Sequence, residues 1–391
     1  MADFFLALWY IKRMDTIGIG IIGAGFMGKT HAHDVKTLPL YYADLPLIPR
    51  LVGICDAVPS SAKAMKEQNG FDFATSSLDE LLARPDIDAV TISTPNVFHR
   101  ENVLAAFRAG KHVYCDKPLA SSYAQALELI EARKNVKRPL VAQVAHQFRC
   151  FPAVMRAKQL LEEGRIGKIM SFHGAYLHSG SIDKNKPIGW KQDKTMGGGG
   201  VLFDLGSHIL DLLYSLLGDF SELFASTRIV YPERPDAAGN RVKIDADDSA
   251  WILLKLADGS QGMVEASKIY TGTNDDFRFE IYGEKGALRF DSMYPNWLEF
   301  FDNTRSEGPY GGERGYTRIE TMSAFEKPGG SFPPAKFPLG FLRSHVHSFY
   351  NFLQSIYAGT PGTPSFEEGA YILKLLETAY ASAREGCWKK V

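Results

Sequence analysis

Two aspartates and a histidine lie in one of the most apolar stretches of the chain, GGGGVLFDLGSHILDLLYSLLG (residues 197–218). An α-helix turns about 100° per residue, so Asp204, His208 and Asp211 fall on one narrow stripe, which Ser215 continues. The other faces are almost entirely apolar, which is typical of a helix enclosed by protein. Burying charged groups without partners is costly, so these side chains need one another, a ligand or a cavity.

The stripe has two interpretations. A histidine in a cleft suits general base catalysis, because its ordinary pKa lies near neutral pH. The same side chains also fit a structural network in which His208 bonds to Asp204 and Asp211 bonds to a neighbouring loop. Gly206 in the middle of the helix costs about 1 kcal/mol relative to alanine, so we expect another element to pack closely there. The four leading glycines predict a hinge or close packing rather than a phosphate site.

Composition limits the classes of protein to consider. The 391 residues are 45% hydrophobic, which predicts a large core and two domains. The formal net charge of −1 gives no reason to expect nucleic acid or a membrane as partner. No apolar run reaches the roughly 18–20 residues that span a bilayer. Four scattered cysteines without a C-x-x-C pair favour free thiols in a reducing compartment, and hence a cytoplasmic protein: Cys55, Cys115, Cys150 and Cys387.

Residues 1–15 are expected to form an N-terminal extension ahead of the first strand. Its apolar run, FFLALWYI, is followed by basic residues instead of being preceded by them, and no small-residue cleavage site follows. A signal peptide is therefore not expected. Because MDTIGIGIIGAG leads directly from Met14 into a strand, we hypothesise that translation starts at Met14 instead of Met1. If the extension is present, we expect it to pack in a surface groove.

A glycine-rich turn follows the first predicted strand, TIGIGII (16–22), and opens a helix. Its three glycines form G-x-G-x-x-G in the setting that this motif requires. They allow a tight turn, close approach of a pyrophosphate to the backbone, and close packing of helix on strand. The cofactor-binding residues expected in this turn are Gly23, Gly25, Phe26, Met27 and Gly28.

The second predicted strand, RLVGICD, ends at Asp56. In a dinucleotide site this carboxylate accepts the ribose hydroxyls, and no arginine follows it to hold a 2′-phosphate, so the sequence favours NAD over NADP. Asp56 lies further from the glycines than the usual roughly 20 residues. We expect the segment LPLYYADLPLIP, with its three prolines, to form a loop that accounts for the excess. The other interpretation of Asp56 is an N-cap of the following helix.

Strands and helices continue to alternate up to residue 147, which predicts a doubly wound parallel sheet over residues 16–147. Ligands of such sheets bind at the carboxyl ends of the strands. Lys117 therefore points toward the cofactor edge. The residues expected at this edge, besides Asp56, are Thr94, Pro95, Asn96, Asp116, Lys117, His146 and Gln147.

Residues 148–391 are expected to form a second domain for substrate binding and oligomerisation. After a bridging helix, FPAVMRAKQLLEEGRIG, alternating segments joined by glycine turns such as ADG and EKG predict a large antiparallel sheet. A sheet face without covering helices suits a homodimer or homotetramer. The segment SFEEGAYILKLLETAYASARE predicts a closing amphipathic helix.

From about Thr16 onward the chain resembles the Gfo/Idh/MocA family of NAD(P)-dependent sugar and cyclitol oxidoreductases. The resemblance rests on GAGFMG, on STPNVFH, on CDKP in place of the family's E-K-P, and on GGGGVLFDLGSHILDL in place of G-G-x-x-x-D-x-G-x-H-x-x-D. It implies an α/β Rossmann domain followed by an α+β domain with a large, open-faced, mainly antiparallel sheet. It implies that His99 joins the cofactor side, and that the catalytic residues are Lys117, Asp204 and His208.

The resemblance further implies hydride transfer from a secondary alcohol of a sugar or cyclitol to NAD. Lys117 or His208, or both, would take the hydroxyl proton, and Asp204 would orient the imidazole or hold a substrate hydroxyl. Asp116 replaces the family's usual glutamate, so we expect slightly different contacts on the cofactor side. Further candidates for substrate contact are His146, Arg149, Trp190 and Lys191. For Trp190 a structural role in the core, and for Lys191 a solvated position at the rim, are equally good interpretations.

Three classes of function remain open. The leading one is a dehydrogenase that releases NADH. A redox-neutral enzyme that retains NAD, for glycoside cleavage, elimination or epimerisation, would use the same residues. A non-catalytic NAD and sugar sensor would have no chemical need for the lysine, aspartate and histidine together. No metal is expected, because His31 and His33 form H-x-H within a helix and so lie on different faces.

Overall fold

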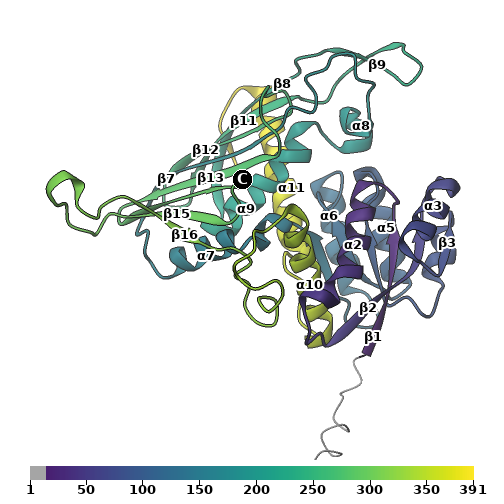
Figure 1. Ribbon diagram of the computed structural model, residues 1–391. Coiled ribbons are helices and arrows are strands. Elements are labelled where there is room, and N and C mark those ends of the chain that lie inside the picture. Colours follow the sequence, from purple (N-terminus) through teal and green to yellow (C-terminus); the bar gives the residue numbers. More distant parts are fainter. Residues whose placement is uncertain (1–14) are drawn as a thin grey trace, which may run out of the picture.

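The computed structural model describes residues 15–391 (Figure 1). The hypotheses about the start codon and about the packing of the N-terminal extension therefore lie outside the described residues. In the described range the chain forms two bodies, each built on its own sheet. The purple and blue first third of the chain makes one body, and the teal and green segments make most of the other (Figure 1).

The first body is the doubly wound parallel sheet that the sequence predicts. Within residues 15–146, six parallel strands lie in the order β3-β2-β1-β4-β5-β6. The order reverses between β1 and β4, which is where such folds bind ligands. The strands are β1 (Asp15–Ile22), β2 (Leu47–Cys55), β3 (Phe73–Thr75), β4 (Ala89–Ile92), β5 (His112–Asp116) and β6 (Ala142–Ala145). The helices are α2 (Phe26–Tyr41), α3 (Pro59–Asn69), α4 (Leu78–Leu82), η2 (Asn96–Phe98), α5 (His99–Arg108) and α6 (Tyr123–Lys134).

The proline-bearing segment after the glycine turn is not the loop predicted from the sequence. Helix α2 continues through Pro39, and β2 begins at Leu47, so only residues 42–46 connect the two elements. Pro39 lies in the last turn of its helix. Pro49 pairs with β1 on one side of β2. On the other side, β3 pairs with β2 only from Gly53 onward, so the backbone nitrogen of Pro49, which has no hydrogen to donate, faces no neighbouring strand. The prolines thus occupy positions that regular elements tolerate.

The second body holds the large, mainly antiparallel sheet that was expected. Its nine described strands lie in the order β16-β15-β14-β13-β7-β12-β11-β8-β17, and among these pairs only β7 and β12 run parallel. The strands are β7 (Ile169–Leu177), β8 (Phe220–Arg228), β11 (Ser249–Leu256), β12 (Gln261–Ser267), β13 (Asp276–Gly283), β14 (Gly286–Asp291), β15 (Trp297–Asp302), β16 (Tyr316–Glu320) and β17 (Lys389–Lys390). A separate hairpin is formed by β9 (Glu233–Pro235) and β10 (Arg241–Lys243).

Helices cover one face of this sheet and leave the other face open (Figure 1). The helical segments after β6 are η3 (Gln147–Cys150), α7 (Pro152–Glu162), η4 (Trp190–Gln192), α8 (Lys194–Gly197), η5 (Leu202–Gly206), α9 (Ser207–Leu217), η6 (Pro309–Gly311), α10 (Phe341–Ala358) and α11 (Phe366–Glu385). The closing helix α11 begins at a capping box, in which Ser365 and Glu368 satisfy each other's backbone amides.

Helix α10, which the sequence analysis did not predict, returns to the first body. It packs against α2, β5 and β6, and Val346, Phe349 and Phe352 complete the core on that face of the parallel sheet. The two bodies are thus joined by a helix as well as by the chain between them.

One helical stretch, 194–217, is long and apolar enough to cross a membrane, but 78% of its most apolar window is buried inside the protein. This is typical of a core helix, and the stretch contains the polar stripe. The cysteines in the described chain are free thiols, three of them buried, as the sequence predicts.

Candidate active site

The helix that carries the polar stripe starts irregularly. It opens with the π turn η5 and continues as α9. The carboxylate of Asp247 accepts the amides of Gly200 and Leu202 at 3.2 and 3.0 Å, and the Gly200 amide also donates to Oη of Tyr380 at 2.9 Å. A Cβ on Gly200 would lie 2.2 Å from the Asp247 amide nitrogen. The glycines therefore provide the close packing that was predicted.

Gly206 lies against β12 in ordinary van der Waals contact, and the closest side chain belongs to its own helical segment. A Cβ at this position would lie 2.8 Å from Cδ1 of Leu202 and 3.8 Å from Cβ of Ala266 on β12. The π turn thus rests directly on the second sheet. Single π turns within α-helices are frequent at functional sites, because they change the direction in which side chains and carbonyls point.

Asp204, within the π turn, lies at the centre of a cluster of lysines. Its Oδ1 is 3.1 Å from Nζ of Lys117 and 2.9 Å from Nζ of Lys191, and its Oδ2 is 2.9 Å from Nζ of Lys268. Burial alone would raise the pKa of Asp204, but the three ammonium groups hold this pKa well below its ordinary value, with Lys268 contributing most. The carboxylate is therefore ionised at neutral pH.

Lys117 reaches this cluster from the carboxyl end of β5. Its Nζ also donates to the backbone carbonyl of Asp204 at 2.5 Å, so the first body touches the site helix directly. Burial lowers the pKa of Lys117, while the charge of Asp204 opposes the shift. A lysine with a lowered pKa is able to exchange a proton with a substrate hydroxyl.

His208, one turn after Asp204, is buried among aromatic rings. The ring centroids of Phe148 and Tyr176 lie 5.1 and 5.7 Å from its own, and that of His146 lies at 5.9 Å. Burial, reinforced by the charge of Lys117, lowers the pKa of His208 well below 6.5, so the imidazole is neutral near pH 7. Its Nδ1 has no hydrogen-bond partner in the described chain. Asp204, whose carboxylate contacts three lysines, makes no hydrogen bond to this ring in residues 15–391.

The lower part of the stripe is structural. Asp211 accepts two hydrogen bonds from Arg149 at 2.8 and 2.6 Å, and Arg149 also pairs with Glu368 at 2.6 Å. This network joins η3, α9 and α11. Asp211 thus bonds to a neighbouring segment of the chain, as its structural interpretation predicted. His146 is buried beside it, with Nδ1 3.6 Å from Oδ2 of Asp211. Ser215 bonds within its own helix. Arg149 thus has its guanidinium committed to two carboxylates.

The glycine turn has the geometry of an anion site. Gly23 has a φ of +102°, and a Cβ on Gly28 would lie 2.0 Å from the Gly23 carbonyl oxygen, so only glycine fits at either position. The space beside Gly25 is open, since a Cβ there meets nothing within 4 Å. Helix α2 starts after Gly25 with no side-chain cap and no acidic residue in its first turn. Its free amides therefore fit a pyrophosphate, with Phe26 72% exposed and Met27 partly buried beside them.

Asp56 at the end of β2 is not the N-cap of α3, a position that Val58 occupies. Its Oδ2 accepts the amide of Ala24 at 2.7 Å and its Oδ1 accepts that of Val58 at 2.9 Å. The carboxylate therefore fixes the glycine turn and the start of α3, and it remains partly exposed where a ribose would lie. Thr94 and Pro95, just beyond β4, are also partly exposed.

Two other predicted cofactor residues hold loops in place. Asn96 donates to the carbonyl of Gly197 at 2.8 Å and so ties the first body to the site helix. His99 is fully buried, and its ring nitrogens lie 2.8 and 2.9 Å from the carbonyl oxygens of Pro118 and Thr94. His99 thus joins the loop after β4 to the loop that carries Lys117, and it exposes no surface to a cofactor.

Three residues of this site were not predicted from the sequence: Lys268, Asp247 and Tyr380. Lys268 follows β12 directly, and a lysine at the end of a strand was the only available signal. Of the weaker substrate candidates, Lys191 joins the cluster, with its ammonium 5.6 Å from the ring centroid of Trp190. Trp190 lies partly buried on η4, at the edge of the lysine cluster.

Comparison with known proteins agrees with this geometry. The family described as "Oxidoreductase family, NAD-binding Rossmann fold" matches residues 17–146, and the "GFO/IDH/MocA C-terminal domain" matches residues 154–289. Levoglucosan dehydrogenase of Pseudarthrobacter phenanthrenivorans is 32% identical over 392 residues, which cover 97% of this chain and 99% of that protein. A solved structure of levoglucosan dehydrogenase in complex with NADH superposes with a TM-score of 0.91 at 32% identity, covering 96% of this chain and 99% of that one.

A further relative has a different activity in its name. The 2,7-anhydro-N-acetylneuraminate hydratase of Mediterraneibacter gnavus is 28% identical over 278 residues, which cover 71% of this chain and 68% of that protein. Both matched domains and the full-length relative lead to one conclusion, in agreement with the glycine turn and the lysine cluster: the chain belongs to the Gfo/Idh/MocA family of NAD-binding oxidoreductases.

Proposed function

We propose that this oxidoreductase oxidises a secondary hydroxyl of a sugar, a sugar derivative or a cyclitol. The observation that carries the proposal is the position of Lys117, which lies at the carboxyl edge of the nucleotide-binding sheet and contacts Asp204 in the other body. Bound NAD supplies the hydride acceptor. A substrate between Lys117, Asp204 and His208 would present its hydroxyl to a proton acceptor and its carbon to the cofactor edge.

Each of the three residues has a distinct role in this proposal. Lys117, with its lowered pKa, hydrogen-bonds the reacting oxygen and takes its proton. His208 is neutral and bonds the same oxygen or the neighbouring one, so it is able to share that proton. Asp204 remains ionised and accepts a hydrogen bond from an adjacent hydroxyl, which orients the ring. Lys191 and Trp190 at the rim complete the proposed sugar site, by hydrogen bonding and by stacking.

NADH absorbance measured with NAD and a panel of monosaccharides, anhydrosugars, glycosides and inositols tests this proposal. Levoglucosan belongs in the panel because it appears in a relative's name. Lys117→Ala and His208→Ala are expected to abolish the signal. Lys255→Ala is a matched control, because this lysine lies on β11 in an ion pair with Glu222, away from the site. A signal that survives Lys117→Ala would contradict the proposed role.

The hydratase relative supports a second candidate, a redox-neutral enzyme that keeps its NAD. Such an enzyme would oxidise its sugar transiently, eliminate or cleave, and then return the hydride. The two candidates differ in the fate of the cofactor. Net NADH formation supports the dehydrogenase. NAD that co-purifies with the protein, together with product formed without net NADH, supports the redox-neutral enzyme.

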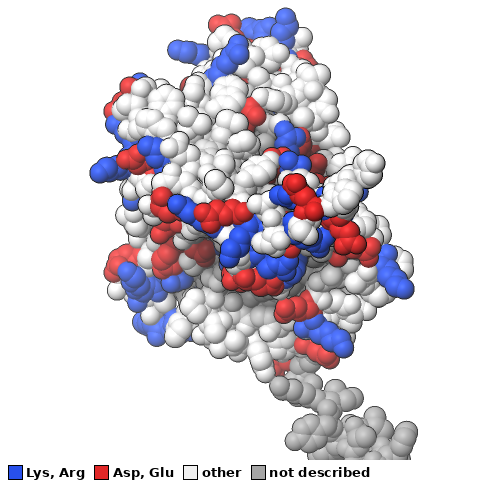
Figure 2. Space-filling model, turned by 90° about the vertical axis from the view of Figure 1, so that its left-hand side faces the viewer, with Lys and Arg blue, Asp and Glu red and all other residues white. Residues whose placement is uncertain are grey.

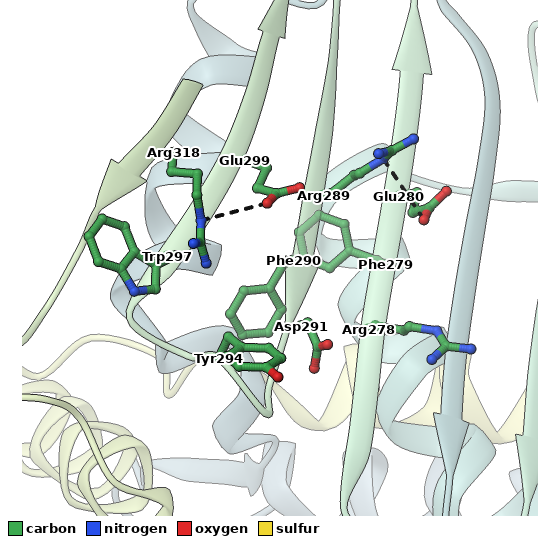
Figure 3. Close-up of a pocket in the computed structure, with 10 residues that line it drawn as sticks. All are labelled: Arg278, Phe279, Glu280, Arg289, Phe290, Asp291, Tyr294, Trp297, Glu299 and Arg318. Atoms are coloured by element: carbon green, nitrogen blue, oxygen red, sulfur yellow. Dashed lines mark ion pairs between the residues drawn. The ribbon is translucent and has the colours of Figure 1, made fainter. Parts of the chain in front are cut away.

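The open face of the second sheet supports a homodimer, our proposal for the assembly of this protein. Leu253 and Met263 face each other across β11 and β12 and are 45% and 37% exposed. Basic and acidic side chains alternate over this side of the molecule (Figure 2). Figure 3 shows a pocket on the same sheet, with Arg318 paired to Glu299. Mixed charges around an apolar pair suit a self-complementary contact between two copies.

Light scattering coupled to size-exclusion chromatography tests this assembly. The wild type is expected to elute with twice the chain mass of 43.4 kDa. The double variant Leu253→Glu, Met263→Glu places two like charges opposite each other in the proposed contact and is expected to elute as a monomer. A monomeric wild type at micromolar concentration would contradict the homodimer.

A further inference from the structure

A second group of buried polar side chains lies behind the parallel sheet, where α10 packs against α2. His31 and Asp34, three residues apart on α2, and His345 on α10 are buried. Both ring nitrogens of His31 and of His345, and Oδ2 of Asp34, have no hydrogen-bond partner among residues 15–391. We call His31, Asp34 and His345 the polar seam.

Neighbouring contacts place the seam between the two helices and β5. The ring of His31 lies edge-on to that of Tyr114 on β5, with centroids 5.3 Å apart. Oη of Tyr114 donates to Oγ of Ser348 on α10 at 2.8 Å. Burial, and to a smaller extent the charges of His31 and His33, lower the pKa of His345 to about 3. His31 and His345 therefore lie near each other where α2 packs against α10, and Asp34 lies one turn after His31 on α2.

Polar atoms in this position require partners. A buried donor or acceptor left unsatisfied costs about 1–3 kcal/mol, and the seam has several such atoms within one contact. Ordered water is the usual partner of buried polar groups that the protein itself does not satisfy. An apolar pair of side chains would pack these helices without that cost, so a structural role alone does not explain the seam.

The inner end of the seam lies at the candidate active site. Asp116, at the carboxyl end of β5, is on the same face of its strand as Tyr114, and its charge acts on His31. Its Oδ1 accepts the backbone amide of Lys117 at 3.1 Å. The charge of Asp116 also acts on the Lys117 ammonium. The seam therefore begins next to the proposed proton acceptor.

The outer end reaches the surface through His33. This side chain is 31% exposed, and its Nδ1 lies 3.5 Å from Oδ1 of Asp34. Burial raises the pKa of Asp34 to about 7, so this carboxyl group is able to take up and release a proton near neutral pH. The order from inside to outside is therefore Asp116, His31 with His345, Asp34 and His33.

We propose that the polar seam holds water and conducts protons between the active site and solvent. The inference rests on the proposed function, since oxidation of an alcohol sends the hydride to NAD and leaves one proton on the site's base at each turnover. That proton passes to the Asp116 carboxylate, then through water and the His31 and His345 imidazoles to Asp34, and leaves from His33. No carbon bond changes in these steps, and the base returns to its unprotonated form. Ketone reduction uses the same path inward.

Replacement of the seam histidines by glutamine separates proton conduction from packing. Glutamine retains hydrogen-bonding groups, but unlike a neutral imidazole it cannot accept a proton on one nitrogen while it releases one from the other. His31→Gln and His345→Gln are therefore the test variants. His347→Gln is the matched control, because His347 lies on the same helix but bonds to Oη of Tyr42, outside the seam.

A single-turnover experiment in weak buffer, with NADH absorbance and a pH-indicator dye recorded together, gives the first readout. In the wild type and in His347→Gln, the proton is expected to appear in solution with NADH. In the two seam variants, NADH should form at the wild-type rate while the proton lags by about tenfold or more. Simultaneous appearance of proton and NADH in both seam variants would overturn the proposal.

A second readout does not depend on activity. In protein labelled with ¹⁵N-histidine, the ring signals of His31 and His345 can be assigned from the variants, and their magnetisation transfer with water measured. A water-filled seam predicts transfer at both rings, and a dry seam, with transfer at neither, overturns the proposal. If the wild type forms no NADH with any substrate, the proposed function fails, and this measurement still decides whether the seam holds water.

Discussion

The ammonium of Lys268 lies 2.9 Å from Oδ2 of Asp204, and so joins the end of β12 to the π turn of the site helix. Lys117 approaches the same carboxylate from the other body. Lysines from both bodies thus form ion pairs with the same carboxylate. The geometry makes Asp204 the point at which the two bodies and the proposed substrate site meet.

Removal of Lys268 should therefore weaken catalysis more than stability. In Lys268→Met we expect the pKa of Asp204 to rise, because the ammonium group that lowers this pKa most is lost. We expect kcat/KM to fall by about 10- to 100-fold, the effect typical of a lost charged contact in an active site. Steady-state kinetics and thermal unfolding measure the two effects. Lys158→Met, at an exposed position of α7, should change neither. A loss of folding in Lys268→Met with activity per folded molecule unchanged would contradict this prediction.

The pH dependence of oxidation should report Lys117. Burial lowers the pKa of this lysine from 10.5, and the unprotonated amine is the form that takes the hydroxyl proton. We expect kcat/KM for oxidation to rise with pH and to level off once the pH exceeds the pKa of Lys117 in the folded protein. This pKa lies below 10.5. His208, with its pKa well below 6.5, should add no step between pH 6 and 8. A rate that is constant from pH 6 to 10 would contradict Lys117 as the proton acceptor.

Cofactor choice should depend on Asp56. In Asp56→Asn only one of the two backbone amides, that of Ala24 or that of Val58, keeps an acceptor oxygen, and the charge that favours ribose hydroxyls over a 2′-phosphate is lost. We expect the Kd for NAD to rise about tenfold, equivalent to about 1.4 kcal/mol, and the preference over NADP to shrink. Titration calorimetry with both nucleotides measures this change. Asp79→Asn, at an exposed position of α4, serves as the control; equal effects of the two variants would rule out the ribose role.

The parts of the fold that depend on local pattern could be predicted from the sequence. The glycine turn was placed correctly because its spacing, its preceding strand and its following helix are all local features. Alternation of strands and helices gave the parallel sheet, and glycine turns gave the second sheet. Lys117 was placed at the carboxyl edge of the parallel sheet because parallel strands bring their carboxyl ends together.

The remaining features depend on tertiary contacts. The stripe of Asp204, His208 and Asp211 assumes a regular helix, but Asp247 and Tyr380 stabilise a π turn at its start. Periodicity therefore could not show that Asp204 points to lysines while Asp211 pairs with η3. Lys268 is distant in sequence and carries no motif. Helix α10 was missed, and with it the seam, because its partners on α2 look like ordinary polar residues in the sequence.

Asp34 gives a prediction for stability, whose sign follows from its pKa. Burial raises the pKa of this carboxyl group from 3.8 to about 7 in the folded protein. Between these two pH values the folded state holds a proton that the unfolded chain has lost. The free energy of unfolding therefore falls as pH rises from about 4 to about 7, and the loss is complete above that range.

The variant Asp34→Asn has no such loss, because its side chain is neutral at every pH. At pH 8 it should be more stable than the wild type by up to about 4 kcal/mol, which is the full shift of roughly three pKa units, and the difference should shrink steadily toward pH 4. Urea unfolding at pH 5 and pH 8 measures this change. Asp44→Asn, at an exposed position between α2 and β2, is the control variant. If the Asp34→Asn gain is the same at both pH values, the carboxyl group does not titrate in this range, and Asp34 cannot pass a proton along the seam.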